Sequence, residues 1–322
     1  MAVSVESTQI ESAGPLLLVH GGAWDIPDSV LDEHREGLEA TLDAGKNPLQ
    51  SGASALALVT DTVAALEAHA AFNAGYGAML NQDGEAELDA GVMEGETLAF
   101  GSVMATRRLA HPVRVARRLL ADGEGRVRML VGQGAERFAE AQGIDLVPNG
   151  DLVCPREQTR YEQIRRQAEA DHPSRSFVPG VSNLGGADTV GAVARDAAGH
   201  LAAATSTGGT PFKPPGRVGD SPLPGAGFYA DERVAVSATG WGEAIAAVGL
   251  ARDVRERVRH GASAEVAARR SLSRMHERVA SPDGEGATGG CIVVTPGDAA
   301  VAFTTPRMAR GWAHGGHAQW AV

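Results

Sequence analysis

Lysine, cysteine and aromatic residues are all scarce in this chain of 322 residues. Lys46 and Lys213 are the only lysines, and arginine carries the remaining basic charge, a bias that we attribute to genome composition. Acidic residues outnumber basic ones, and the formal net charge is −11. Since nucleic acids and anionic membranes are bound through basic surfaces, we expect neither as a partner.

Two cysteines, Cys154 and Cys291, are too few for a disulfide framework, and neither has metal-ligating residues at a useful spacing. Cys291 lies in the apolar segment GGCIVV, which predicts a packed core thiol. No run of about 18 apolar residues occurs, and the N-terminal residues lack a basic stretch followed by an apolar one. We therefore expect no membrane segment and a cytoplasmic location.

Glycine is abundant, with 41 residues, and the hydrophobic share of 43 % is typical of a globular, turn-rich protein. Apolar periodicity predicts strands at 16–19, about 232–238, 290–295 and 300–305, and helices at 31–45, 56–66, 112–123, about 130–141, about 242–259 and about 263–279. The first strand is expected to end in a turn at Gly21 and Gly22. Strands in both halves and the absence of an internal repeat favour a single α+β domain.

Residues 186–209, GADTVGAVARDAAGHLAAATSTGG, predict a β-hairpin with Thr189 at the head of its first strand. A threonine hydroxyl becomes a useful nucleophile when a base lies beside it, and a free α-amine with a pKa of about 7.7 to 8.0 is such a base. Thr189 is internal. This chemistry therefore requires its hydroxyl to attack the Asp188 carbonyl and form an ester, which water then cuts to leave fragments of 188 and 134 residues.

Residues 155–188 precede this threonine and are polar, charged and then rich in Pro, Ser and Gly. Such a composition is typical of a mobile linker, here with a short charged helix at its start. Its position fits a segment that yields to cleavage.

Several segments in one order resemble the plant-type L-asparaginases, or isoaspartyl peptidases, of the N-terminal-nucleophile hydrolases. They are LLLVHGGAW (16–24), LEAHAAFNAGYGAML (66–80), ELDAGVMEG (87–95), GADTVGAVA, LAAATSTGG, PGRVGDSPLPGAG and SATGWGE. The resemblance covers most of the chain outside 1–14 and about 140–185. It implies a four-layer αββα sandwich, formed as one precursor domain over 1–322 and cut into an α subunit (1–188) and a β subunit (189–322).

The resemblance also implies roles for individual residues. Thr189 would be the nucleophile, Thr207 would bond its hydroxyl, and Asn73 would bind its free amine. The Thr239 hydroxyl and the Gly240 N–H would form the oxyanion hole, where losing one donor typically costs about 10² to 10³ in rate.

Arg217 and Asp220 lie three residues apart in GRVGDS. A guanidinium and a carboxylate complement the α-carboxylate and α-ammonium of an amino-acid headgroup, whereas the alternative is a mutual surface salt bridge of little value. By resemblance both bind the headgroup together with Gly242, where the backbone approaches the ligand. Trp241 stands where relatives often carry Thr or Lys, and it would narrow the pocket if it pointed inward.

No catalytic cofactor is expected. The histidines His20, His34 and His69 lack the spacing of a metal cluster and are expected to be surface or core histidines. The resemblance implies a structural sodium ion bound through backbone carbonyls of Leu66, Glu67, His69, Phe72, Ala74 and Tyr76.

The implied activity is hydrolysis of L-asparagine and of β-aspartyl dipeptides by an (αβ)2 dimer of cleaved units. Asp188 departs from the family pattern, because isoaspartyl peptidases usually have glycine there, and Asp-Thr resembles glycosylasparaginases and threonine aspartases. The C-terminal FTTPRMARGW follows the pattern only loosely. Two alternatives therefore stand: a hydrolase of glycosylated asparagine, and an uncleaved protein that binds amino acids without catalysis.

Overall fold

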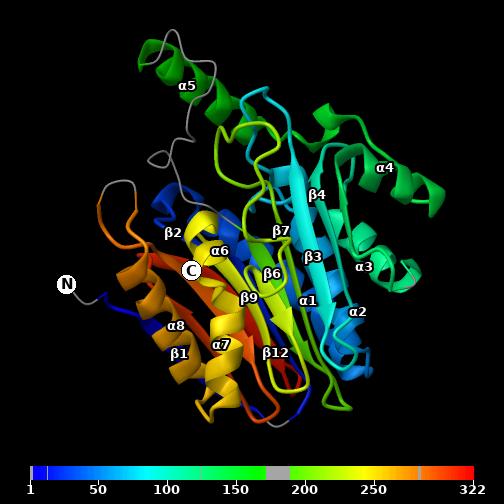
Figure 1. Ribbon diagram of the computed structural model, residues 1–322, viewed down its shortest axis with the longest axis vertical. Helices are drawn as coiled ribbons and strands as arrows, with labels where there is room; N and C mark the ends of the chain where they lie inside the picture. Colours follow the sequence, from blue (N-terminus) through cyan, green and yellow to red (C-terminus); the bar gives the residue numbers. More distant parts are fainter. Residues whose placement is uncertain (1–2, 13, 124, 172–188, 282–283) are drawn as a thin grey trace.

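The computed structural model describes residues 3–12, 14–123, 125–171, 189–281 and 284–322 (Figure 1). These residues form thirteen strands in two sheets and eight α-helices. The helices are α1 (Leu31–Gln50), α2 (Ala55–Glu67), α3 (Pro112–Asp122), α4 (Gly132–Ala141), α5 (Pro155–Asp171), α6 (Gly242–Val248), α7 (Leu250–Arg259) and α8 (Ala264–Arg278). Short 3-10 helices cover Asp28–Val30, Gly75–Gly77 and Asn149–Leu152. None of the helices in these ranges is both long and apolar enough to cross a membrane.

One sheet has eight strands in the order β13-β12-β2-β6-β7-β3-β4-β5. Its strands are β2 (Leu16–Trp24), β3 (Leu88–Glu94), β4 (Phe100–Thr106), β5 (Met129–Val131), β6 (Val190–Arg195), β7 (Leu201–Thr207), β12 (Arg307–His314) and β13 (His317–Ala321). The predicted hairpin is β6–β7, which lies in the middle of the sheet, and every residue of both strands is buried. Because β6 is paired on both edges, the residue at its head is held in a fixed position.

The other sheet has five strands in the order β1-β11-β10-β9-β8. They are β1 (Glu6–Glu11), β8 (Phe228–Ala230), β9 (Ala235–Gly240), β10 (Gly289–Val294) and β11 (Asp298–Phe303). The antiparallel pair β9–β10 runs from Gly240 opposite Gly289 to Ala235 opposite Val294. The final predicted hairpin, β10–β11, is confirmed, and Cys291 lies fully buried in it.

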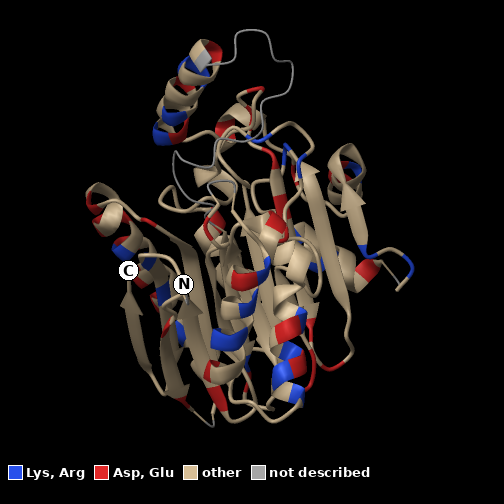
Figure 2. Ribbon diagram, turned by 60° about the vertical axis from the view of Figure 1, so that its left-hand side comes forward, with Lys and Arg blue, Asp and Glu red and all other residues tan. Residues whose placement is uncertain are grey.

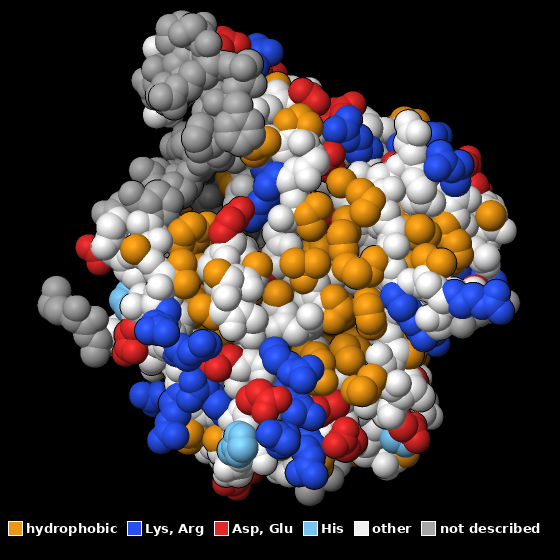
Figure 3. Space-filling model, viewed as in Figure 1, with side chains coloured by type: hydrophobic (Ala, Val, Ile, Leu, Met, Phe, Trp, Pro, Cys, Tyr) orange, Lys and Arg blue, Asp and Glu red, His pale blue; other side chains and the backbone are white. Residues whose placement is uncertain are grey.

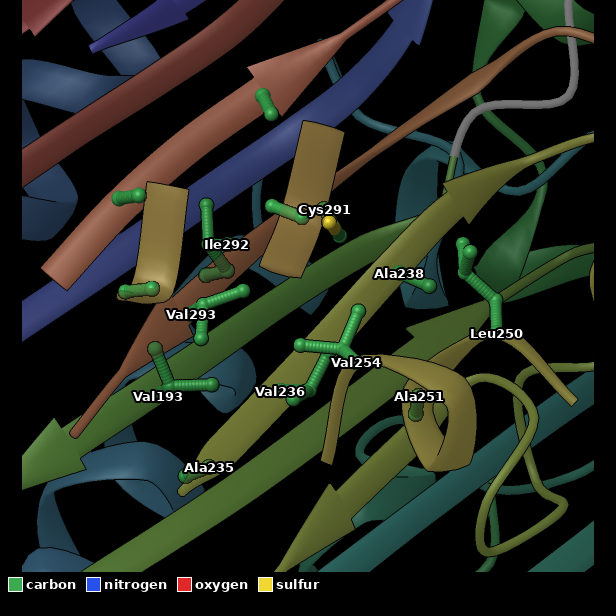
Figure 4. Close-up of a cluster of buried hydrophobic side chains, with 14 of the residues drawn as sticks. Val193, Ala235, Val236, Ala238, Leu250, Ala251, Val254, Cys291, Ile292 and Val293 are labelled. Atoms are coloured by element: carbon green, nitrogen blue, oxygen red, sulfur yellow. The ribbon is translucent and has the colours of Figure 1, made fainter. Parts of the chain in front are cut away.

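The two sheets face each other, and apolar side chains fill the space between them. Strands β6 and β7 contact β9, and β2 contacts β10. Val193 of β6, Ala235 of β9 and Ile292 of β10 contribute to this layer (Figure 4). Strands covered on both faces carry continuous apolar sequences, which explains the alanine-rich and valine-rich runs of the hairpin.

Helices cover the outer faces of both sheets. Helices α7 and α8 pack on the five-stranded sheet, whereas α1, α2 and α3 pack on the eight-stranded one (Figure 1). Most charged residues lie on helices and loops, away from the strands (Figure 2). Helix α2 begins where the Ser54 hydroxyl accepts the Ala57 N–H over 3.3 Å, which satisfies one of its unpaired donors.

Most of the predicted elements are confirmed, but three boundaries are wrong. Helix α3 begins at Pro112 and ends before Gly123, as predicted. Strand β2 runs through the expected turn to Trp24, and α1 runs past Gly45 to Gln50. A Cβ on Gly45 would lie 2.7 Å from the Leu17 side chain, so this glycine allows close helix–sheet packing instead of ending a helix. The predicted helix 242–259 is two helices, because Gly249 adopts φ 60° between them.

Helix α5 is longer than the short helix that the composition predicts. Its Tyr161 hydroxyl donates to the Gln82 carbonyl over 3.2 Å, and Ile164 packs with Phe212. The rest of the predicted linker, residues 172–188 with Asp188, lies outside the described residues.

Candidate active site

Thr189 is the residue directly before β6, as predicted, and the pairing of β6 fixes its position. Strand β6 pairs with β7 from Val190 opposite Ser206, and with β2 from Gly191 opposite His20. Thr189 is only 4 % exposed. A hydroxyl on a rigid strand end, enclosed by protein, meets the positional demand on a nucleophile.

The backbone N–H and the side-chain hydroxyl of Thr189 both face other hydroxyl groups. The Thr189 N–H donates to Thr239 Oγ1 over 3.3 Å, and Thr189 Oγ1 lies 3.2 Å from Ser221 Oγ. Thr239 is fully buried near the end of β9, where Gly240 adopts φ 134°. Cleavage before Thr189 would turn its nitrogen into an α-amine. Thr239 therefore lies beside the atom that would act as the base.

A buried histidine–serine pair supports the start of β6. His20 Nε2 lies 2.7 Å from Ser237 Oγ, and both side chains are fully buried. Burial lowers the pKa of His20 to about 3, so its imidazole is neutral. A Cβ on Gly191 would lie 2.0 Å from Ser237 Oγ and 2.4 Å from His20 Nε2. Only glycine lets β6 pass this pair, and His20 is a core histidine, as expected.

Thr207 and Asn73 meet at the turn that follows β7. The Gly209 N–H donates to Thr207 Oγ1 over 2.9 Å, and Asn73 Nδ2 donates to the Gly209 carbonyl over 2.6 Å. The Asn73 Oδ1 accepts the Met79 N–H over 2.8 Å. Both side chains hold this turn, whereas the Thr189 N–H and hydroxyl contact Thr239 and Ser221.

Arg217 forms a two-point ion pair with Glu243. The Nε and Nη2 atoms of Arg217 donate to the two carboxylate oxygens of Glu243, each over 2.9 Å. The Arg217 side chain is 14 % exposed, whereas that of Glu243 is 53 % exposed. The alternative of a mutual surface pair between Arg217 and Asp220 does not describe this loop, because Asp220 is buried.

Asp220 carries an unsatisfied carboxylate at this site. Its Oδ2 is buried and has no hydrogen-bond partner within the described ranges. Burial raises the pKa of Asp220 to about 7, although the nearby Arg217 guanidinium acts in the opposite direction. A Cβ on Gly242 would lie 2.8 Å from both Arg217 Nη2 and Asp220 Oδ1. The three residues predicted to bind a headgroup are thus brought together.

Trp241, next to Gly242, is partly buried and packs against the hydrophobic cluster around the five-stranded sheet. The backbone N–H of Trp241 donates to the Thr288 carbonyl over 3.3 Å, just before helix α6 begins. The indole is therefore supported by the core beside the headgroup residues.

Two buried charges lie next to this group. Lys213 is fully buried, and its Nζ donates to the Glu87 carbonyl over 2.8 Å. Burial lowers the pKa of Lys213 and raises the pKa of Asp89. The opposite charge of each residue counteracts the pKa shift of the other. A Cβ on Gly209 would lie 3.0 Å from Lys213 Nζ and 3.3 Å from Arg217 Nη1. The turn after β7 therefore rests on a lysine and an arginine.

The loop predicted to bind sodium connects α2 with the 3-10 helix Gly75–Gly77, which contains Tyr76. A Cβ on Gly75 would lie 2.3 Å from the Glu67 carbonyl oxygen, and one on Gly77 2.2 Å from that of Phe72. Four of its carbonyls each accept a backbone N–H and keep a second lone pair, namely those of Leu66, His69, Phe72 and Ala74. Such oxygen donors suit a hard cation. In the described part of the chain, no three or more His, Cys, Asp or Glu side chains gather to hold a metal ion.

Sequence reasoning did not identify Ser221, Glu243 or Lys213. Ser221 and Glu243 directly follow Asp220 and Gly242, so their neighbours in sequence were the available signal. Nothing in the local pattern of Lys213 indicates its complete burial.

Comparisons with known proteins agree with this arrangement. A family model described as Asparaginase matches residues 13–322. The chain is 42 % identical over 297 residues to the isoaspartyl peptidase/L-asparaginase of Bos taurus, which covers 91 % of each chain. It is 40 % identical over 301 residues to the protein of the same name from Xenopus laevis, covering 93 % of this chain and 91 % of the relative. It is also 40 % identical over 315 residues to the isoaspartyl peptidase of Salmonella typhimurium, covering 94 % and 96 %. The chain therefore belongs to the asparaginase family.

Proposed function

We propose that this chain is a self-cleaving amidohydrolase that acts on L-asparagine and on β-aspartyl dipeptides. The observation that carries the proposal is the position of Thr189. Thr189 lies at the head of a central strand, its nitrogen faces the Thr239 hydroxyl and its own hydroxyl faces Ser221. Ser221 directly follows Asp220, one of the residues predicted to bind the substrate headgroup. The names of the relatives, isoaspartyl peptidase and L-asparaginase, supply the substrate class.

Activation begins with attack of the Thr189 hydroxyl on the Asp188 carbonyl. The Asp188–Thr189 amide bond breaks as the ester bond forms, and the threonine nitrogen takes up a proton to become an amine. Water then hydrolyses the ester and leaves an α subunit of residues 1–188 and a β subunit of residues 189–322. Thr189 Oγ is free again, now beside its own α-amine.

Turnover uses the same atoms. The neutral α-amine of Thr189 takes the hydroxyl proton as the oxygen attacks the side-chain amide carbonyl of the substrate. The Thr239 hydroxyl and the Gly240 N–H stabilise the oxyanion. Ammonia or an amino acid leaves with a proton from the amine, and water hydrolyses the β-aspartyl ester to aspartate. The contact between the Thr189 nitrogen and Thr239 supports this assignment.

Substrate selection falls to Arg217 and Asp220. The guanidinium binds the α-carboxylate in place of the Glu243 carboxylate, and the buried Asp220 carboxylate binds the α-ammonium. The unsatisfied Asp220 Oδ2 supports this role, because a buried acceptor without a partner gains most from a bound donor.

The wider arrangement is proposed from the same family. The two facing sheets with outer helices support assignment to the four-layer αββα sandwich of N-terminal-nucleophile hydrolases, and the unit would assemble as an (αβ)2 dimer. Hydrophobic side chains gather in the central part of one face, a candidate surface for such pairing (Figure 3). The tight loop after α2 would hold a structural sodium ion through its backbone carbonyls, and no catalytic cofactor is required.

The test is intact mass spectrometry of purified protein after incubation at neutral pH. Wild-type chain and Thr189→Ser are expected to give two fragments that break before residue 189, and Thr189→Ala is expected to stay whole. Release of ammonia from asparagine and of amino acid from β-aspartyl dipeptides should follow cleavage. Turnover of glycosylated asparagine alone would favour the glycosylasparaginase alternative. A whole chain that binds amino acids without turnover would favour the binder.

A further inference from the structure

The segment ELDAGVMEG (87–95) carries part of the family resemblance, but none of its residues acts in the mechanism above. Its first residue, Glu87, is only 2 % exposed. Glutamate is almost never buried to this extent unless its carboxylate is paired and hydrogen-bonded. The groups that bond Glu87 therefore indicate what this residue holds together.

On one side, Glu87 holds the loop that carries Arg217. The Gly216 N–H donates to Glu87 Oε2 over 2.8 Å, and Lys213 Nζ donates to the main-chain carbonyl of Glu87 over 2.8 Å. Gly216 directly precedes Arg217. The carboxylate therefore bonds the backbone one residue away from the guanidinium that is proposed to bind the substrate headgroup.

Arg217 is the last residue of a tight turn, closed by donation of its N–H to the Pro214 carbonyl over 3.0 Å. Pro215 at the second position and Gly216 with φ 83° at the third are typical of a type II turn. Both prolines lack an N–H, so the Gly216 N–H is the one backbone donor that this turn offers to the rest of the protein. Pro215 and Gly216 are exposed, so packing does not hold them. The orientation of the turn therefore depends on the bond from Gly216 to Glu87.

On its other side, Glu87 is fixed by Arg107. The Nε and Nη2 atoms of Arg107 donate to Glu87 Oε1 over 3.1 and 3.0 Å, which leaves Oε2 directed at Gly216. The same guanidinium donates through Nη1 to Oε2 of Glu85, whose side chain is 40 % exposed. Among the described residues, no hydrogen bond joins the Glu85 carboxylate to the Arg217 loop. The two glutamates thus share one arginine, and Glu87 is the one whose carboxylate also holds the turn.

Short contacts connect the same loop to the nucleophile. A Cβ on Gly242 would lie 2.8 Å from both Arg217 Nη2 and Asp220 Oδ1, so these two groups flank one point. Ser221 follows Asp220 directly, and its hydroxyl lies 3.2 Å from Thr189 Oγ1. A rotation of the turn would therefore displace the guanidinium from Asp220 without moving the nucleophile, which the strand β6 holds.

We propose that Glu87 is a positioning residue for substrate binding, which presets the Arg217 guanidinium for the substrate α-carboxylate by holding the Gly216 N–H. This rests on the proposed function, because it explains how the headgroup site of that function is kept in place. Without the bond, the turn adopts other orientations, and the apparent affinity falls with the fraction of chains that hold the competent one. A contact made equally in the ground state and the transition state changes KM and leaves kcat unchanged. If Glu87 only neutralised Arg107, Glu85 would be equivalent to it.

The experiment measures steady-state ammonia release from L-asparagine by cleaved wild-type enzyme, Glu87→Gln and the matched control Glu85→Gln. The amide of Glu87→Gln has one acceptor oxygen for two sets of donors, so either Gly216 or Arg107 loses its partner, while the main-chain bond to Lys213 is kept. Glu85→Gln takes a carboxylate from the same arginine and leaves the loop contacts in place. Rates are divided by the cleaved fraction from intact mass, and the assay temperature lies well below the Tm of each variant. Loss of folded or cleaved protein therefore does not enter KM.

We expect Glu87→Gln to raise KM for asparagine about tenfold, as for one lost hydrogen bond to a charged group, with kcat within about twofold of wild type. Glu85→Gln should change neither constant. An unchanged KM in Glu87→Gln, a fall in kcat alone, or equal increases of KM in both variants would overturn the proposal.

If Glu87→Gln does not fold, Arg107→Gln tests the same link, because it removes the donors that fix Glu87 Oε1. It should raise KM about threefold, as for a loosened bond of this kind, and an unchanged KM would overturn the proposal. Absence of asparagine hydrolysis by the wild-type enzyme would instead count against the proposed function.

Discussion

Replacing Asp220 by asparagine is expected to stabilise the folded chain while it strongly weakens substrate binding. The Asp220 carboxyl is buried, its Oδ2 lacks a partner in the described residues, and burial raises its pKa from the ordinary 3.8 to about 7. Asparagine has nearly the same shape and removes the buried charge. A residue kept at the expense of stability is common at functional sites.

The expected magnitude follows from proton linkage. Since the pKa is raised in the folded state, the folded chain binds this proton more tightly than the unfolded chain. Ionisation of Asp220 therefore destabilises the folded state above pH 3.8. The resulting loss in the free energy of unfolding increases with pH until about pH 7, where it levels off. Three pKa units correspond to about 4 kcal/mol, while at pH 5 the cost is about 2 kcal/mol. The value of about 4 kcal/mol is an upper bound for the stabilisation by Asp220→Asn, because the new amide is also desolvated.

The assay is thermal unfolding at pH 8 and pH 5 in a Thr189→Ala background, which keeps every sample uncut. For a chain of this length 4 kcal/mol corresponds to about 6 °C in Tm. Asp220→Asn should raise Tm by several degrees at pH 8 and by about half as much at pH 5. An unchanged Tm at pH 8, or the same increase at both pH values, would refute the buried-charge reasoning.

The activity of the cleaved enzyme gives an independent reading. Protonated Asp220 cannot pair with the substrate ammonium, and a protonated Thr189 α-amine cannot act as the base, so wild-type kcat/KM for asparagine should fall about 100-fold per pH unit well below pH 7. Asp220→Asn should lose at least about 100-fold in kcat/KM through KM, as for a lost buried charge pair. A fall of only about tenfold per pH unit between pH 5 and pH 6, as for the amine alone, would place the ammonium elsewhere.

Three further changes test the site. Ser221→Ala removes the hydroxyl 3.2 Å from the proposed nucleophile and should lower kcat about tenfold with little change in KM, measured by steady-state ammonia release; a larger change in KM than in kcat would contradict the contact. Glu243→Gln should lower KM for asparagine about threefold, because it weakens the pair that competes for Arg217, and an increased KM would show that Glu243 assists binding. Gly191→Ala places a Cβ 2.0 Å from the Ser237 oxygen and should lower the free energy of unfolding, measured by urea titration, by about 2 kcal/mol or more. The control Gly134→Ala in α4 has nothing within 4 Å of the new Cβ and should be neutral or stabilising in the same titration.

The positions of helices and strands were largely predictable, because they follow from local periodicity. Pro112 and Gly123 bracket α3, and two apolar runs separated by a turn mark the strands of the β6–β7 hairpin. The errors at Gly21 and Gly45 have one cause. Both glycines lie where another element approaches closely, with the Phe72 ring 2.4 Å from a Cβ on Gly21, and sequence does not distinguish this use of glycine from a turn.

The candidate site was predictable in part. The place of Thr189 at a strand head and the complementary charges of Arg217 and Asp220 could be derived from short segments. The burial that raises the pKa of Asp220, the Glu243 partner of Arg217 and the burial of Lys213 could not be derived, because each depends on which elements pack over the loop.

Sequence alone thus determined the elements of this protein, its family and the identity of the residue that would act as nucleophile, since these are properties of neighbouring residues. Tertiary structure alone decided which groups surround that residue. The hydroxyls of Ser221 and Thr239 are 32 and 50 residues away from Thr189 along the chain, and they reach it because the GRVGDS loop and β9 fold over the head of β6.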